Sequence, residues 1–336
     1  MKFNQFFSAV DSCPYCADKN AVVLSVVDGK TREKLITVAC DGCGLGRVDP
    51  MPSEQDLDKW YKEKYRQSYK GIEKPKLKYV LRAARNARER FNWIGESIKI
   101  DLKNYLKNNV TKSLDIGSSS GEFVFLMRNL GFDAIGIEPH QGYADYAIKE
   151  HDLNILSGAL AERINLIEEK SIHLVTMFHV LEHLPDPVKS LKEIARILSP
   201  DGYLYIEVPN ATRITSPHYM FFKAHVLYFT KKTLINLLEK SSFEVVHSSD
   251  EDSGNLRVIA KLHDGLADNY VLETAHKHDL ISAQAKRKWL PYLFKQMIEN
   301  KFFIRMQKKF EEKNTAARYN NGPDLLVDVY KDVNFP

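Results

Sequence analysis

The sequence predicts an α/β protein: a parallel sheet covered by helices on both faces, with a small cysteine-bearing module in front of it and helical additions. Three observations support this prediction. From Ser113 onward, short apolar runs alternate with amphipathic stretches, which is typical of parallel strands joined by helices. All four cysteines lie within the first 43 residues. Residues 265–318 combine a helical pattern with many basic side chains.

Composition and charge narrow the class of protein. The 336 residues are 44% apolar and 11% aromatic, which is enough to bury a substantial core. With 48 basic and 44 acidic residues, the net charge of +4 is too small to indicate a nucleic-acid partner by itself. No apolar run has the length of a signal-peptide core or of the roughly 20 residues that a membrane span needs. We therefore expect a globular, cytoplasmic protein without a membrane span.

The chain is expected to divide into four segments. They are a cysteine-bearing module at 1–50, a helical linker or lid segment at 51–110, an α/β domain at 111–264 and a helical extension at 265–336. In the α/β domain, strands are expected at 112–117, 134–138, 154–157, 172–178 and 202–208, and helices at 121–130, 142–150, 160–168, 187–198 and 231–240. Two further runs, FEVVHSS and NLRVIAKL, predict an antiparallel hairpin that completes the sheet.

Outside the α/β domain, local signals predict where helices begin and break. Ser53 is a suitable N-cap for a helix that runs through Trp60 and Tyr65. Apolar residues at helical spacing predict a second helix over residues 76–108. In the C-terminal extension, Pro291 is expected to kink or divide the helical region.

The four cysteines form two C-x2-C pairs, Cys13 with Cys16 and Cys40 with Cys43. The pairs flank two β-rich runs joined by a turn at Asp28-Gly29, an arrangement that places four thiolates around one point. Four sulfur ligands suit a closed, structural zinc site. Redox pairs, inert buried thiols and a rubredoxin-like iron are the alternatives that this pattern leaves open.

The stretch LDIGSSSGEF, residues 114–123, has the features of a cofactor loop between a strand and a helix. Asp115 lies near the end of the strand, Gly117 permits a sharp turn, and Gly121 lets the next helix approach a ligand closely. The dinucleotide spacing G-x-G-x-x-G fails at Ser119 and Glu122. Glu138, 21 residues after Gly117, ends the second strand and suits the two hydroxyls of a ribose. Together they indicate a nucleoside cofactor, whereas the loop taken alone could be a plain turn.

These motifs resemble those of the class I S-adenosylmethionine-dependent methyltransferases over roughly residues 110–262. LDIGSSSG corresponds to the family motif LDIGxGxG, and Glu138 corresponds to the acidic residue after the second strand. MFHVLEHLPDP resembles the motif of strand four. Ser119 replaces the central glycine, which is a departure. The resemblance implies a Rossmann-like, seven-stranded sheet and S-adenosyl-L-methionine as cofactor. It implies cofactor contacts for Asp115, Gly117, Ser118, Ser119, Gly121, Glu138, Pro139, Gly158, Ala159, Phe178 and His179.

The order of cysteine module, helical segment and methyltransferase motifs resembles sugar methyltransferases of the deoxysugar C-methyltransferase type, although their long C-terminal domain is not recognisable here. The resemblance implies an acceptor-facing role for His183. It also implies a substrate-facing tyrosine in the region of Tyr61 and Tyr65, for which packing is the open alternative. Where those enzymes have Glu-His, this chain has Ala224 and His225. The missing glutamate favours a hydroxyl acceptor, with His183 or His225 as general base. Hydrogen bonding or packing is an open alternative for each histidine.

The expected function is therefore methylation of a hydroxyl on a sugar, sugar nucleotide or glycan precursor. Methylation of carbon or nitrogen on a related small molecule is the nearest alternative. Basic segments at 62–90 and 286–313 could attract a diphosphate-linked sugar or bind RNA. An RNA methyltransferase is therefore a second alternative. A non-catalytic, cofactor-binding assembly protein is a third alternative.

Overall fold

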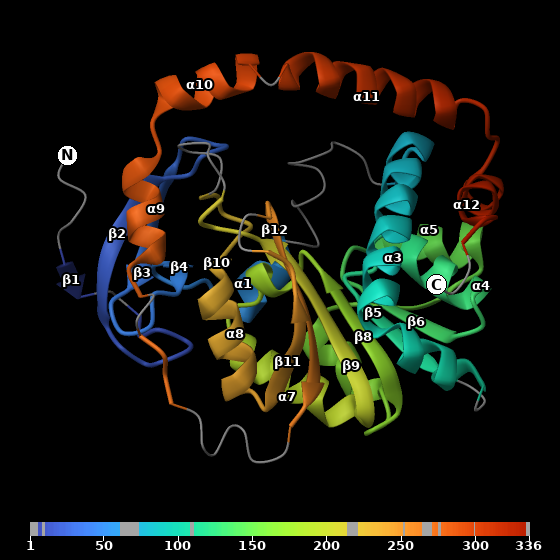
Figure 1. The fold of residues 1–336 in the computed structure, drawn as a ribbon, viewed down its shortest axis with the longest axis horizontal. Coiled ribbons are helices and arrows are strands. Elements are labelled where there is room, and N and C mark those ends of the chain that lie inside the picture. Colours follow the sequence, from blue (N-terminus) through green and yellow to red (C-terminus); the bar gives the residue numbers. More distant parts are fainter. Residues whose placement is uncertain are drawn as a thin grey trace. The chain divides into compact units, whose positions relative to one another are not determined.

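The computed structural model describes residues 6–8, 11–60, 74–107, 111–213, 221–250, 253–263, 271–274, 277–298 and 300–333 (Figure 1). The chain forms two compact units. Unit 1 consists of Met1–Leu57, Phe178–Ala195 and Ile206–Glu299, and unit 2 of Asp58–Met177, Arg196–Tyr205 and Asn300–Pro336. The division into four segments stays a prediction.

The central feature is a seven-stranded sheet in the order β11-β12-β9-β8-β5-β6-β7. β5 pairs in parallel with β6 and β8, β6 pairs in parallel with β7, and β11 pairs antiparallel with β12. The strands are β5 (Lys112–Ile116), β6 (Asp133–Glu138), β7 (Asn154–Ser157), β8 (Ile172–Phe178), β9 (Leu198–Pro209), β11 (Phe243–Ser248) and β12 (Asn255–Leu262). This confirms the predicted Rossmann-like sheet and its terminal hairpin.

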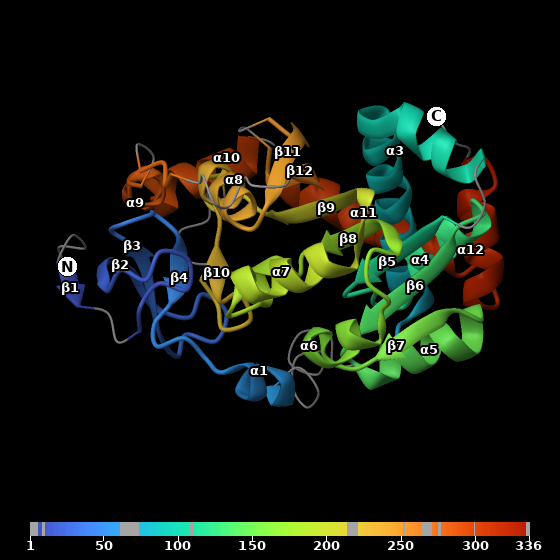
Figure 2. The same ribbon diagram turned by 90° about the horizontal axis from the view of Figure 1, so that it is seen from below.

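In unit 2, helices pack around the parallel strands. They are α3 (Leu77–Lys107), α4 (Glu122–Asn129), α5 (Gln141–His151), α6 (Leu160–Arg163), α11 (Lys301–Ala316) and α12 (Gly322–Tyr330). α4 contacts β5 and β6, and α5 lies along β7 (Figure 2). α3 packs against α4, α11 and α12 through buried residues at helical spacing, among them Val80, Leu81 and Ala84. The helix kinks at Ile98, where φ is −130°.

The C-terminal extension contains separate helices rather than one long helix. α9 (Asp279–Lys286) and α10 (Trp289–Ile298) belong to unit 1, and α11 to unit 2. The chain leaves the helical conformation at Arg287 and again at Asn300. Pro291 lies in the first turn of α10, where a missing N–H costs no helical hydrogen bond. The break therefore falls before α10 and not at Pro291.

Unit 1 contains a second, five-stranded sheet in the order β1-β2-β3-β4-β10. Its strands are β1 (Phe6–Ser8), β2 (Asn20–Val27), β3 (Lys34–Cys40), β4 (Gly46–Val48) and β10 (Leu227–Tyr228). β10 pairs antiparallel with β4, so a strand from far along the chain completes the sheet of the cysteine module. Arg47 of β4 forms an ion pair of 2.7 Å with Asp49, and both side chains are 1% exposed.

Three further helices complete the described part of the chain: α1 (Glu54–Trp60), α7 (Pro187–Ile197) and α8 (Lys231–Lys240). Ser53 caps α1 as predicted, because its Oγ accepts the Asp56 N–H at 3.1 Å. Tyr65, proposed as a substrate-facing residue, lies outside the described residues. No helix in the described ranges is both long and apolar enough to cross a membrane.

Candidate functional site

The loop after β5 has the backbone conformation that its glycines predict. Gly117, Ser119 and Gly121 have φ angles of 75°, 54° and 83°, all in the left-handed region. A Cβ at Gly121 would lie 2.4 Å from Cδ1 of Leu153, so any other residue here would have to displace that side chain and adopt a strained positive φ. Ser119 stands where the family motif has glycine, and its positive φ explains that preference: a non-glycine residue there costs about 1 kcal/mol.

Glu138, at the end of β6, lies beside this loop. Its Oε2 accepts the Ser119 N–H at 2.8 Å, and its Oε1 accepts the His140 N–H at 2.9 Å. Each carboxylate oxygen keeps one lone pair for a further donor. The carboxylate is therefore fixed by the backbone and can still accept hydrogen bonds from two neighbouring hydroxyls, as a ribose requires.

Asp115 is a fully buried carboxyl group directly before the loop. Thr176 Oγ1 donates a hydrogen bond to its Oδ1 at 2.7 Å. Burial, with the nearby charges of Glu122 and Glu138 adding to it and Thr176 and Arg90 opposing it, raises the pKa of Asp115 to about 7. A positively charged ligand group next to Asp115 would favour its ionised form. The amino group expected of the cofactor has that charge.

The other predicted cofactor residues of unit 2 have different surroundings. Ser118 Oγ is buried without a hydrogen-bond partner among the described residues, and it lies against the backbone of Gly136 on β6. Gly158 donates its N–H to the Glu138 carbonyl at 3.0 Å and has a φ of 141°. Ala159 is the buried N-cap of α6, and Pro139 is half-buried beside Glu138. Gly158, directly after β7, therefore adjoins Glu138, whereas Ser118 faces the sheet.

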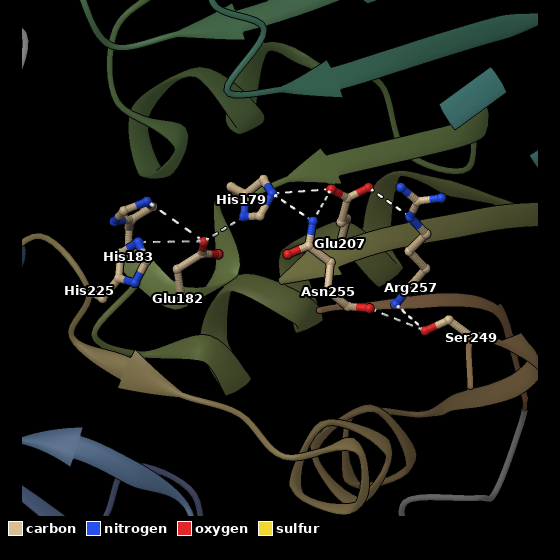
Figure 3. Close-up of polar contacts among 8 residues, drawn as sticks. All are labelled: His179, Glu182, His183, Glu207, His225, Ser249, Asn255 and Arg257. Atoms are coloured by element: carbon tan, nitrogen blue, oxygen red, sulfur yellow. Dashed lines mark hydrogen bonds and ion pairs between the residues drawn. The ribbon is translucent and has the colours of Figure 1, made fainter. Parts of the chain in front are cut away.

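In unit 1, the residues after β8 form a network of histidines and carboxylates (Figure 3). His179, which follows Phe178 with a φ of 58°, lies between Glu182 and Glu207. Its Nδ1 is 3.3 Å from Glu182 Oε1, and its Nε2 is 3.1 Å from Glu207 Oε1. Burial lowers the pKa of His179, but the two carboxylates outweigh it and raise the pKa to about 9. His179 is therefore an imidazolium at neutral pH, which makes it unsuitable as a general base.

Glu207 receives further donors that hold this network in place. Asn255 Nδ2 and Arg257 Nε lie 2.9 Å and 3.2 Å from its two carboxylate oxygens (Figure 3). Both donors come from β12, and Glu207 itself comes from β9. The charge of His179 is thus fixed by side chains from two neighbouring strands.

His183 and His225 lie on the other side of Glu182, and both are largely buried. Their Nε2 atoms are 4.0 Å and 3.9 Å from Glu182 Oε1, and their ring centroids are 4.9 Å apart. The ligand atoms of the three side chains all lie within 4.8 Å of one another, close enough for a shared proton, water or cation. Glu182 Oε2 is buried and has no hydrogen-bond partner among the described residues.

The protonation states of the two histidines follow from their surroundings. Burial lowers the pKa of His183, and it lowers that of His225 well below the ordinary value. The positive charges of His179 and Lys30 act in the same direction on both. His183 Nδ1 lies 2.6 Å from the Ala224 carbonyl, so this nitrogen donates and the lone pair is on Nε2. Both rings are neutral at pH 7.

Sequence reasoning named His183 and His225, and the structure brings them together. It missed Glu182 between them, although this residue belongs to the same HVLEHLPDP motif. Its position three residues after His179 on a turn was the available signal. Phe178 and His179, expected as cofactor contacts, lie in unit 1 with the histidines, and the β5 loop lies in unit 2. The assigned roles of all these residues stay predictions.

The four cysteines of unit 1 gather as their spacing predicts. Cys13 and Cys43 have sulfur atoms 3.6 Å apart, and Cys16 and Cys40 have sulfur atoms 3.4 Å apart, with no disulfide among them. All four sulfurs lie within 4.8 Å of one another. Four converging thiols on two β-hairpin turns are the donor set of a structural zinc site.

Comparison with known proteins identifies the family. Residues 77–248, just over half of the chain, match the family described as "Methyltransferase domain". The chain is 28% identical over 153 residues to the C-methyltransferase NovU of Streptomyces niveus, covering 44% of this chain and 36% of that protein. It is 30% identical over 143 residues to a tRNA U34 carboxymethyltransferase of Aliarcobacter butzleri, covering 39% and 46%.

A third relative and a solved structure are also similar to part of this chain. The ubiquinone biosynthesis O-methyltransferase of Coxiella burnetii is 24% identical over 157 residues, covering 44% of this chain and 63% of that protein. A methyltransferase structure from Archaeoglobus fulgidus aligns at 20% identity with a TM-score of 0.40, covering 51% of this chain and 94% of the other. The chain spans less than two thirds of the length of these three curated relatives. By its family match and its sheet, the chain belongs to the S-adenosylmethionine-dependent methyltransferases.

Proposed function

We propose that this chain transfers a methyl group to a hydroxyl of a sugar, sugar nucleotide or glycan precursor. The observation that supports this most is the pair of neutral histidines, His183 and His225, beside the buried carboxylate of Glu182. A hydroxyl that attacks a methyl group must lose its proton, and a neutral imidazole is the side chain best suited to accept it near pH 7. The Glu182 carboxylate would then stabilise the imidazolium that forms.

The β5 loop and Glu138 would hold the cofactor. S-adenosylmethionine, when bound, supplies the methyl group on a sulfonium that leaves as a neutral thioether. Glu138 would accept the two ribose hydroxyls, and Asp115 would pair with the amino group. Gly117 and Gly121 would let the backbone pass close to the amino-acid end of the ligand.

Methylation of carbon is the second candidate, because NovU is a C-methyltransferase. Removing a proton from carbon calls for a carboxylate beside the acceptor, and this chain has Ala224 where sequence comparison expects glutamate. Glu182 lies 3.9 Å from His225 Nε2 and is the only carboxylate that is seen that close to His225 among the described residues. Its Oε1 already faces His179, which favours the hydroxyl acceptor.

We also propose that the four cysteines hold one structural zinc ion. Metal analysis of the purified protein should give one equivalent of zinc, and Cys13→Ser should lose it. Glu182→Gln is the matched control, because it removes a potential ligand from the histidine cluster and leaves the thiols intact. Zinc retained in Cys13→Ser would contradict the four-thiolate site, and a second equivalent lost in Glu182→Gln would assign a metal to the histidines.

The proposed activity can be tested with methyl-labelled cofactor and fractionated cell extract. Label should appear in the small-molecule fraction and should resist prior treatment of the extract with ribonuclease. The carbon or oxygen position of the new methyl group would then be read by NMR spectroscopy. Calorimetry that detects no S-adenosylhomocysteine binding would overturn the proposal, and label that depends on intact RNA would favour the RNA alternative.

A further inference from the structure

α10, in unit 1, presents large apolar side chains to the solvent. They are 49% to 76% exposed and follow one another at the spacing i, i+3, i+4, i+7, i+8, which places them on one side of the helix: Leu290, Leu293, Phe294, Met297 and Ile298. Apolar residues that are exposed singly are ordinary on a protein surface. Five of them on one side of a ten-residue helix are typical of an interaction surface.

α11, in unit 2, is held against α3 and also exposes apolar side chains. Its Glu312, whose side chain is 1% exposed, accepts a hydrogen bond from Arg82 Nε of α3 at 3.0 Å. Met306 and Phe310, one helical turn apart, are 53% and 68% exposed. The contacts with α3 therefore fix the helix and leave this apolar pair at the surface.

The charge of the same segment favours an anionic partner. Residues 286–313 contain nine basic and three acidic residues, an excess of positive charge larger than the net +4 of the whole chain. Two of the three acidic side chains, Glu311 and Glu312, already pair with arginines of α3. Lys308, Lys309 and Lys313 are exposed on α11. A second copy that presented the same helices would bring like charges together, which opposes self-association through them.

We propose that α10 and α11 bind an anionic lipid surface. A helix that combines exposed Leu, Phe and Met side chains with lysines lies in the plane of the membrane interface: the apolar groups enter the acyl boundary and the ammonium groups meet the lipid phosphates. Each of the two helices has this pattern by itself. The helices would lie on the membrane and not cross it. This inference goes beyond the proposed function and does not depend on the acceptor.

The apolar side chains distinguish a lipid surface from a nucleic acid. RNA would attract the lysines, because its phosphates bind cations, but it offers no apolar interior for Leu290, Leu293, Met297 or Ile298. A lipid surface uses both features, since apolar burial and electrostatic attraction add in interfacial binding. Lipid binding should therefore depend on the apolar residues of α10 and on the lysines of α11, whereas RNA binding should depend on the lysines alone.

The test measures co-sedimentation of the full chain with two kinds of vesicle, one of phosphatidylcholine alone and one of phosphatidylcholine and phosphatidylglycerol in equal amounts. The unchanged protein should bind the anionic vesicles, and about 0.5 M salt should weaken this binding. The double variant Phe294→Ser with Met297→Ser should bind them about tenfold less or weaker still, because two apolar side chains no longer enter the lipid. Val271→Ser, which alters an 85% exposed apolar residue of the same unit, is the control and should bind as the unchanged protein does.

The lysines are tested in the same assay. Lys308→Gln with Lys309→Gln should reduce binding to the anionic vesicles about 10- to 30-fold, as expected when two cations near the surface are lost. The matched control is Lys149→Gln with Lys170→Gln, which removes two exposed lysines elsewhere in the same unit and should leave the binding unchanged.

Further measurements separate the possible outcomes. Thermal melting should show equal stability of all variants, because the changed side chains are exposed. An unchanged protein that does not bind the anionic vesicles overturns the proposal, and so does binding that survives both double variants. Retention of RNA without vesicle binding, lost only in the lysine variant, would replace the lipid by a nucleic acid. A dimer in analytical ultracentrifugation that Phe294→Ser with Met297→Ser dissociates would assign the apolar side of α10 to a second copy and overturn it as well.

Discussion

The cofactor loop and the histidine cluster are built in opposite ways. The loop is defined by its backbone conformation, with three residues of positive φ between 117 and 121. The Glu138 carboxylate that accepts the Ser119 N–H is only 19 positions away in the sequence. The cluster is defined by side chains from segments that are distant in the sequence. His183 hydrogen-bonds to the Ala224 carbonyl 41 positions away, and Asn255 hydrogen-bonds to Glu207 48 positions away. The loop is therefore encoded locally, and the cluster exists only once the chain has folded.

If this contrast reflects a division of labour, changes in the cluster should reduce turnover and leave cofactor affinity intact. His225→Ala and His183→Asn should each be tested, since asparagine keeps a donor for the Ala224 carbonyl and removes the basic nitrogen. Loss of a general base lowers kcat about 10²- to 10⁴-fold. The measurements are kcat at saturating substrate and calorimetric binding of S-adenosylhomocysteine.

The two variants also identify the base. A large loss of kcat in only one of them assigns proton transfer to that histidine. Equal, modest losses with full cofactor binding would indicate that both rings only position the acceptor. A kcat that is unchanged in both variants would remove the cluster from the proposed chemistry.

The complementary test changes Glu138, the carboxylate beside the loop, and should reduce cofactor affinity. Glu138→Ala removes the proposed acceptor of two ribose hydroxyls and the carboxylate that receives the N–H groups of Ser119 and His140, so S-adenosylhomocysteine affinity should fall about 100-fold or more. Glu138→Gln should fall less, because it keeps one acceptor oxygen. Glu168→Ala, an exposed carboxylate of the same unit, is the control. Affinity that survives Glu138→Ala would contradict the cofactor assignment.

The backbone character of the loop can be tested separately from its charge. Gly121→Ala places a methyl group 2.4 Å from Leu153 Cδ1 and forces alanine to a φ of 83°, which should cost about 1–3 kcal/mol of unfolding free energy. Gly254→Ala is the matched control, because no heavy atom lies within 4 Å of the added carbon. Denaturant titration measures both. Equal stability of the two variants would show that the loop does not need its left-handed glycine.

The same contrast explains what sequence reasoning could predict. Strand and helix positions followed from periodicity. The helix predicted at 231–240 is α8, and the structure shows that Thr230 caps it. The loop and Glu138 could be placed because their partners lie within about 20 residues. The cysteine pairs could be placed for a different reason: the C-x2-C spacing defines each turn, although the sulfurs that face one another are 24 and 30 positions apart in the sequence.

The remainder depended on contacts that no local pattern encodes. Glu207 has no local signal in the sequence, and only the fold brings it to His179, 28 positions away, whereas Glu182 lies three residues after His179 and could have been found from its motif. The contact of Lys30 with Phe222 likewise has no local signal, because Asp28 joins the loop between β2 and β3 to Lys223 across 195 positions. β10, two residues long, has no periodicity to detect, yet it completes the sheet of the cysteine module.

The smallest predicted effect is on the pH dependence of kcat. Burial, with Lys30 and His179 adding to it, lowers the pKa of His183 and His225, while Glu182 partly opposes this for His183. A base must be unprotonated to act, so kcat should stay level as the pH falls through 6.5 and should decline only in more acidic buffer. Lys30→Met removes a positive charge that disfavours protonation. It should therefore raise both pKa values and move the acidic decline toward neutral pH. Rate profiles over roughly pH 5 to 8 measure the shift. An acidic limb that Lys30→Met moves toward lower pH would show that Lys30 does not act on these histidines through its charge.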